Sequence, residues 1–95
     1  MRVAWTDNAV RHLSGIYDYI ALNSPTYALR MVDRITRRST QIAANPLSGR
    51  IVPEYQEKDV RELIERPYRI IYRIRPDQID ILAVIHGARL LSGRL

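Results

Sequence analysis

Arginine and histidine side chains gather on one face of a predicted β-hairpin in the C-terminal part of the chain. These side chains are Arg69, Arg73, Arg75 and His86. Arginine presents a planar fork of donors that fits a phosphate or a carboxylate, and histidine can act as an acid or a base near neutral pH. The pattern therefore predicts a surface for an acidic partner, either nucleic acid or an acidic protein segment.

The two strands of this hairpin define their own register. Side chains of a strand alternate between faces, and Pro76-Asp77 has the composition of a tight turn. A two-residue turn predicts these cross-strand pairs: Ile74 with Ile79, Arg73 with Asp80, Tyr72 with Ile81, Ile71 with Leu82, Ile70 with Ala83, Arg69 with Val84 and Tyr68 with Ile85. One face is then apolar. The other carries the arginines, has His86 at its end, and places opposite charges directly across at Arg73 and Asp80.

The composition indicates one small folded domain over residues 1–95. Apolar residues make up 46% of the chain, too many for a disordered protein. The formal net charge of +5 comes from 14 Arg and one Lys against 10 acidic residues, which favours an acidic partner, although a GC-rich genome also favours arginine codons. Without cysteine, disulfides and thiolate metal sites are impossible. No signal-peptide core or membrane-length apolar run occurs, so we expect a soluble cytoplasmic protein.

Two amphipathic helices precede the hairpin and are expected to cover its apolar face. Apolar residues recur at spacings of three and four from Ala9 to Ile20 and again from Ala28 to Ile42. Their predicted limits are a start at Thr6 or Asp7, a second start at Ser24-Pro25 and a stop at Asn45-Pro46. On the first helix, His12 is expected to face solvent.

Short strands at residues 1–5 and 60–64 complete the order β-α-α-β-β-β. This order predicts an α+β domain with a helical hairpin packed on the apolar face of a mainly antiparallel, twisted sheet. The opposite face is expected to stay open to solvent or a partner. The predicted core consists of Tyr68, Ile70, Tyr72, Ile74, Ile79, Ile81 and Ile85 packed against Leu13, Ile16, Ile20, Val32 and Ile35.

Several short motifs occur in an order that is typical of one superfamily. They are Pro46-Leu-Ser-Gly-Arg50, Val52-Pro-Glu54, Arg61-Glu-Leu63, Tyr68-Arg-Ile-Ile-Tyr-Arg-Ile74 and His86-Gly-Ala-Arg89. With the helical spacings, they resemble the RelE/ParE superfamily, the toxins of bacterial type II toxin–antitoxin systems. The resemblance runs over almost the whole chain and implies the same α+β fold.

The resemblance implies one of two activities. RelE-like members are ribosome-dependent endonucleases that cut mRNA, whereas ParE-like members inhibit DNA gyrase. Both are neutralised by an antitoxin whose C-terminal segment wraps the toxin. The implied protein is thus a cytoplasmic component of a plasmid-stabilisation type of system, in a hetero-oligomer with its antitoxin, with no cofactor, metal or membrane partner.

Nuclease members of the superfamily supply basic residues on the middle strands, an arginine after the last strand, and an aromatic residue or histidine near the C-terminus. The resemblance would assign phosphate binding and acid–base catalysis to four residues: Arg69, Arg73, His86 and Arg89. However, the basic position four residues before Tyr68 is Ile64, and Ser92-Gly-Arg-Leu95 stands where RelE has a late tyrosine. The chain is therefore closer to ParE-like members.

Three hypotheses follow from the sequence. The first is a ParE-like gyrase inhibitor without enzymatic activity, the second a RelE-like mRNA endonuclease, and the third a member that only binds its antitoxin. The predicted partner-binding residues are Arg61, Arg69, Arg73, Arg75, His86 and Arg89.

Overall fold

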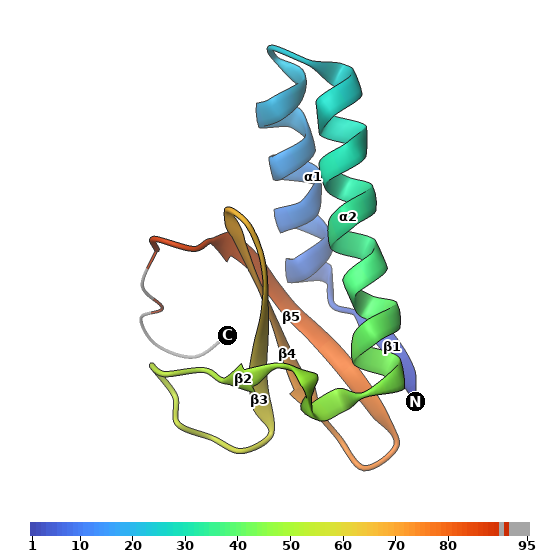
Figure 1. Ribbon diagram of the computed structural model, residues 1–95, viewed down its shortest axis with the longest axis vertical. Coiled ribbons are helices and arrows are strands. Elements are labelled where there is room, and N and C mark those ends of the chain that lie inside the picture. The colour runs from blue at the N-terminus through green and yellow to red at the C-terminus, as the bar shows by residue number, and fades with distance from the viewer. Residues whose placement is uncertain (90, 92–95) are drawn as a thin grey trace.

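The computed structural model describes residues 1–89 and residue 91, and has two helices on one face of a five-stranded sheet (Figure 1). The elements are β1 (Arg2–Trp5), α1 (Asp7–Ala21), α2 (Pro25–Ala44), a 3-10 turn (Pro46–Ser48), β2 (Arg50–Ile51), β3 (Val60–Glu65), β4 (Tyr68–Ile74) and β5 (Gln78–His86). The strand order is β1-β5-β4-β3-β2, with only the β1–β5 pair parallel. The predicted α+β fold is confirmed. The predicted short tail, at Leu90 and residues 92–95, lies outside the described residues.

Both helices begin at the predicted capping residues. The Thr6 hydroxyl accepts a hydrogen bond from the Ala9 N–H at 3.2 Å, and the Ser24 hydroxyl accepts one from the Tyr27 N–H at 3.1 Å. These bonds satisfy backbone donors that have no partner inside the helix. The end of the hairpin between α1 and α2 extends well beyond the sheet (Figure 1). Within the described part of the chain, no helix is long and apolar enough to cross a membrane.

The predicted register between β4 and β5 is correct near the turn and wrong beyond it. Ile74 pairs with Ile79, Arg73 with Asp80 and Tyr72 with Ile81, as predicted. A β-bulge then leaves Leu82 without a partner, so the observed pairs become Ile71 with Ala83, Ile70 with Val84, Arg69 with Ile85 and Tyr68 with His86. A bulge places two residues of one strand opposite one of the other, and every later side chain of β5 therefore changes face.

The bulge is held by polar side chains at the start of α1. The Leu82 carbonyl accepts a hydrogen bond from Asn8 Nδ2 at 3.0 Å, and the Ile81 carbonyl accepts one from Thr6 Oγ1 at 2.7 Å. Because β1 ends at Trp5, opposite Ile81, these side chains supply partners to β5 where β1 no longer does. The change of register thus follows from a tertiary contact.

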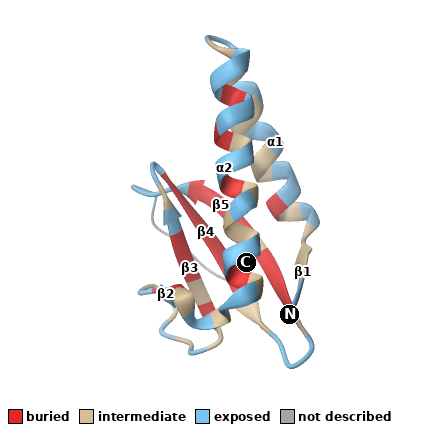
Figure 2. Ribbon diagram, turned by 45° about the vertical axis from the view of Figure 1, so that its right-hand side comes forward, coloured by how far each residue is buried: buried red, intermediate tan, exposed pale blue. Residues whose placement is uncertain are grey.

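The sheet separates two apolar clusters, and buried positions run along β3, β4 and β5 (Figure 2). The cluster under the helices includes Met31, Ile35, Ile42, Leu63, Tyr68, Ile70, Tyr72, Ile79, Ile81 and Val84, with Leu13, Ile16, Ile20 and Ile74 partly buried beside it. The cluster on the other face consists of Val52, Val60, Ile71, Ala83 and Ile85, packed with Tyr55, Leu82 and Leu91. The prediction that Ile85 packs under the helices is therefore wrong, as is the prediction of a fully open second face. The loop after β2 partly covers that face.

Candidate functional site on the second face of the sheet

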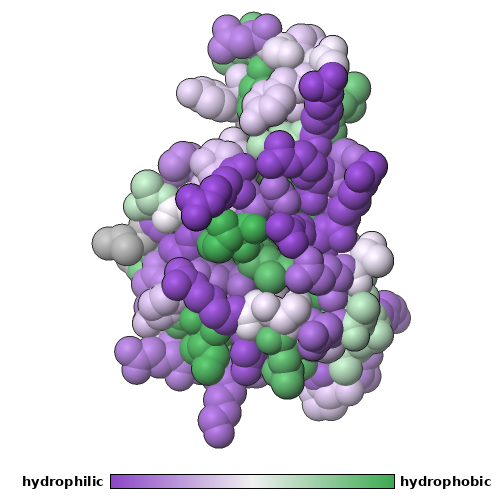
Figure 3. Space-filling view, viewed as in Figure 1, coloured by the Kyte–Doolittle hydropathy of each residue, from purple (hydrophilic) through white to green (hydrophobic). Residues whose placement is uncertain are grey.

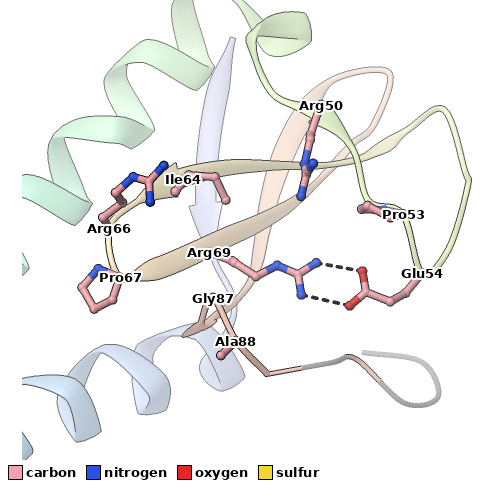
Figure 4. A pocket seen from close by; sticks show the side chains of 9 residues that line it. All are labelled: Arg50, Pro53, Glu54, Ile64, Arg66, Pro67, Arg69, Gly87 and Ala88. Atoms are coloured by element: carbon pink, nitrogen blue, oxygen red, sulfur yellow. Dashed lines mark hydrogen bonds and ion pairs between the residues drawn. The ribbon is translucent and has the colours of Figure 1, made fainter.

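A groove of about 860 Å³ lies on the second face, beside the ends of β3 and β4 (Figure 4). It is lined by Arg50, Pro53, Glu54, Ile64, Arg66, Pro67, Arg69, Gly87 and Ala88. These residues come from three separate segments: β2 with its following loop, the β3–β4 hairpin, and the turn after β5. The groove therefore exists only once the sheet has formed.

Arg69 forms the floor of the groove and is only 5% exposed. Its guanidinium makes a bidentate ion pair with Glu54, with NH1–Oε2 at 2.9 Å and NH2–Oε1 at 2.8 Å (Figure 4). Its Nε donates to Glu62 Oε1 at 2.8 Å, and NH1 also donates to the Arg89 carbonyl at 2.9 Å. A buried guanidinium needs such partners because an unpaired buried charge is very costly.

The two carboxylates link Arg69 to the rest of the groove. Glu62 is 1% exposed and forms a second ion pair, in which its Oε2 accepts a hydrogen bond from Arg50 Nε at 2.6 Å. Glu54 accepts the Leu91 N–H at 3.0 Å, which ties the segment after β5 to the loop after β2. The hydrogen bonds from Arg69 lower the pKa of Glu54 to about 2, and those from Glu54 and Glu62 raise the pKa of Arg69.

The other arginines of this face are also paired. Arg73 NH1 lies 2.8 Å from Asp59 Oδ2, and Arg75 Nε donates to Asp80 Oδ2. The predicted opposition of Arg73 and Asp80 is present in the register, but the ion pair of Asp80 goes to Arg75. The predicted cationic face is therefore largely neutralised by carboxylates from the loop between β2 and β3 and from β5.

The remaining predicted site residues lie elsewhere. The bulge places His86 on the helix side of the sheet, where its ring meets Tyr68 edge-on with centroids 6.1 Å apart. Arg61, opposite Tyr72, donates to the carbonyls of Lys58 and Gly49 at 3.1 and 3.0 Å. The expected single surface holding Arg69, Arg73, Arg75 and His86 is thus not present, because His86 and Arg69 are on opposite faces.

The sequence patterns did not predict that Glu54, Asp59 and Glu62 would pair with the arginines of this face. Glu54 and Asp59 stand in a loop that must pass the arginine face of β4, a placement that could have suggested ion pairs. Glu62 follows from the pairing of β3 with β4, which puts it opposite Ile71 and on the same face as Arg69. Arg66 is a further exposed cation of the groove.

The groove also contains an exposed cationic side chain and an exposed apolar side chain. The side chain of Arg50 is 65% exposed despite its contact with Glu62, and Ile64 is 40% exposed opposite Arg69 in the register. The groove can therefore receive a segment that offers a carboxylate to Arg50 or Arg66 and an apolar side chain to Ile64. Among the described residues, no group of three or more His, Cys, Asp or Glu is placed to hold a metal ion.

Comparison with known proteins gives a consistent assignment. The family model described as the ParE toxin of the type II toxin–antitoxin system, parDE, matches residues 3–91. A relative from Sinorhizobium fredii named toxin Y4kP is 40% identical over 88 residues, covering 90% of this chain and 88% of the relative. A relative from Caulobacter vibrioides named toxin RelE2 is 34% identical over 90 residues, covering 94% of this chain and 98% of the relative.

Solved structures agree with the fold. A chain of the chromosomal ParDE toxin–antitoxin system from P. aeruginosa superposes with a TM-score of 0.75 at 30% identity, covering 90% of this chain and 95% of that chain. The YoeB dimer from Staphylococcus aureus superposes with a TM-score of 0.61 at 16% identity over the same shares, a likeness of fold alone. With a family match over nearly its whole length, this chain belongs to the ParE toxin family, within the RelE/ParE superfamily of type II toxin–antitoxin toxins.

Proposed function

We propose that this protein is a ParE-like inhibitor of DNA gyrase that is held inactive by its cognate antitoxin. The observation that carries the proposal is the state of Arg69, which is buried and engaged by Glu54 and Glu62. RNA cleavage of the RelE type needs cations free to hold a phosphate, together with an acid and a base beside it. Arg69 is occupied by carboxylates, and His86 lies across the sheet from it.

The groove supports the antitoxin part of the proposal. Beyond its short pairing with β2, the outer edge of β3 from Leu63 to Glu65 has no neighbouring strand among the described residues. An extended segment can add to such an edge through its backbone and place alternate side chains in adjacent pockets. Exposed Ile64, with Arg50 and Arg66 around it, suits an antitoxin segment that carries acidic residues and Leu or Val anchors. The side of the molecule seen in Figure 3 is mainly hydrophilic, with separate apolar patches.

A second candidate, a RelE-like mRNA endonuclease, is favoured by the similarity to the relative named RelE2. In that case His86 and Arg89 are the groups available for catalysis, since both are exposed while Arg69 is not. Substitution of either residue by alanine would then abolish cleavage.

The two activities are separated by assaying the purified full chain for transcript cleavage in cell-free translation and for inhibition of gyrase supercoiling. We expect intact transcripts and reduced supercoiling. His86→Ala and Arg89→Ala should change gyrase inhibition only in a graded way, and Arg30→Gln, an exposed change on α2, serves as the control for loss of one positive charge. Cleavage in the ribosomal A site that disappears in His86→Ala or Arg89→Ala would show that the gyrase proposal is wrong.

A further inference from the structure

A second cavity, of about 450 Å³, lies between α1 and the end of β5, on the helix side of the sheet. It is lined by Arg11, His12, Gly15, Ile16, Tyr19, Tyr68, Val84, Ile85, His86 and Arg89. Small-molecule sites commonly occupy roughly 300–1,000 Å³, so the volume suits a small ligand or one unit of a polymer. Its chemistry differs from that of the groove around Arg69.

Among the residues that the structure describes, the lining of this cavity is cationic and contains no carboxylate. In the described part of the chain, seven arginines form ion pairs: Arg34, Arg37, Arg38, Arg50, Arg69, Arg73 and Arg75. Arg11 and Arg89 have no ion-pair partner among the described residues, and Arg11 NH2 donates a long hydrogen bond to Asn8 Oδ1 at 3.5 Å. Like charges gathered without a counter-charge leave a positive potential that favours an anion.

Burial and this positive potential both lower the pKa of His12. Partial burial lowers its pKa, and repulsion from Arg89 and Arg11 lowers it further. No carboxylate of residues 1–89 contributes to the shift. Both guanidinium groups therefore act electrostatically on the same ring, although Arg11 lies on α1 and Arg89 follows β5.

Both histidines are fixed by backbone hydrogen bonds that also fix their tautomers. The Val84 N–H donates to His12 Nδ1 at 3.1 Å, and the Ala88 N–H donates to His86 Nδ1 at 3.1 Å. A ring nitrogen that accepts a hydrogen bond carries no proton, so the proton of each neutral ring is on Nε2. The Nε2–H of each ring is therefore a donor that these backbone hydrogen bonds do not use. The expectation that His12 simply faces solvent is wrong, because its ring completes the open edge of β5.

Aromatic rings lie beside the cations. Tyr68 and Tyr19 line the same cavity, and Tyr19 is 73% exposed at the surface of α1. Sites for nucleotides and single strands combine cations for the phosphate with aromatic rings on which bases stack. Two guanidinium groups and two Nε2–H donors match a phosphate better than a single carboxylate, which has fewer acceptor oxygens and less charge.

We propose that this cavity binds the phosphate of a nucleotide, with Arg11, Arg89, His12 and His86 as its ligands and Tyr19 beside the base. The nucleotide is either free or part of a single strand. Nothing in this binding requires the proposed inhibition of gyrase, so the two proposals can fail independently.

The test is an NMR titration of the full-length protein with inorganic phosphate, AMP and a short single-stranded oligothymidylate. We expect shifts of the two histidine rings and of the Val84 and Ala88 amides. Because hydrogen bonds to charged groups are the strong ones, Arg11→Gln and Arg89→Gln should each weaken binding by about tenfold or more. Arg30→Gln removes the same charge from an exposed position on α2 and should leave binding unchanged.

The probes also identify the source of the phosphate. Binding of AMP indicates a free nucleotide, and binding of the oligothymidylate alone indicates a single strand. The proposal is overturned if no probe shifts these resonances, or if Arg30→Gln weakens binding as much as Arg11→Gln, which would indicate diffuse charge. It is also overturned if a short polyglutamate peptide binds the cavity more tightly than every phosphate probe, since the site would then take carboxylates. Supercoiling assays on the same variants show separately whether gyrase inhibition depends on the cavity.

Discussion

Arg69 shows how one residue can change from a predicted ligand into a structural centre. Its position in β4 points it to the second face of the sheet, as the alternation of the strand requires. The surrounding carboxylates and the Arg89 carbonyl then use the donors that a phosphate would need. The residue therefore joins β3, the loop after β2 and the segment after β5.

Removal of Arg69 should be strongly destabilising. In Arg69→Ala, the buried Glu62 is left with the exposed Arg50 as its ion-pair partner, and breaking a buried ion pair in this way costs about 3–5 kcal/mol of the free energy of unfolding. Arg37→Ala removes an exposed pair with Asp33 and should cost less than about 1 kcal/mol. Urea unfolding followed by the fluorescence of Trp5 measures both. Equal costs for the two variants would contradict the structural role of Arg69.

The carboxylate of Glu54 should make stability depend on acidic pH. Its pKa falls from an ordinary 4.5 to about 2 in the folded protein, so its contribution is complete above pH 4.5 and disappears as the pH drops toward 2. Glu54→Gln should be less stable at neutral pH and lose less further stability on acidification. Urea unfolding at several values between about pH 2 and pH 6 tests this, and parallel pH curves for the two proteins would refute it.

At the scale of elements, the turn before β2 depends on one close approach. The Gly49 N–H donates to the Tyr72 hydroxyl at 3.0 Å, and that hydroxyl donates to the Pro46 carbonyl at 2.6 Å. A side chain at Gly49 would begin 2.5 Å from this hydroxyl and 2.6 Å from the Glu62 carbonyl. The motif Pro46-Leu-Ser-Gly-Arg50 therefore needs glycine so that the turn can lie against the sheet.

We expect Gly49→Ala to lower the melting temperature because Tyr72 or the backbone of β3 must move. Overpacking of this kind typically costs about 1–3 kcal/mol. Gly15→Ala is the matched control, since nothing lies within 4 Å of a side chain at that helical position. Alanine there should stabilise α1 by up to about 1 kcal/mol. Thermal unfolding by circular dichroism compares them, and equal shifts for both variants would argue against the close approach.

At the scale of the whole molecule, the sheet keeps two charged sites apart. The groove around Arg69 lies on one face, and the cavity of Arg11 and Arg89 lies on the face that carries the helices. Most arginines near the groove are neutralised by ion pairs, so the net charge of +5 acts on a partner mainly through the exposed cations. In the proposed recognition of the antitoxin, Arg50 and Arg66 are the exposed cations of the groove.

The association rate with the antitoxin should therefore fall as salt increases. Charges at the rim of an interface mainly accelerate encounter, and salt screens them over about 10 Å at 0.1 M. Arg66→Gln should reduce the dependence on salt, whereas Arg30→Gln on the outer side of α2 should reduce it less. Stopped-flow association at several ionic strengths measures the slopes. A rate that is indifferent to salt would remove the electrostatic part of the proposed recognition.

The sequence by itself determined the elements and the family. Capping at Thr6 and Ser24, the turn at Pro76-Asp77 and the first three pairs of the β4–β5 hairpin are local features, and each is present in the structure. The ordered motifs gave the superfamily, which the comparisons confirm. Local chemistry sufficed because caps and tight turns depend on residues that are close together in the chain.

Only the tertiary structure decided which side chains share a face beyond the bulge. The run Leu82-Ala-Val-Ile85 is uniformly apolar, so alternation contains no polar residue that marks the inner face. The register there depends on Asn8 and Thr6, which are distant in sequence and bind the carbonyls of β5. The partners of Arg69 likewise arrive from a loop and from β3. Long-range contacts thus placed His86 on the helix side of the sheet and buried Arg69, because burial and charge pairing depend on neighbours that the local sequence does not specify.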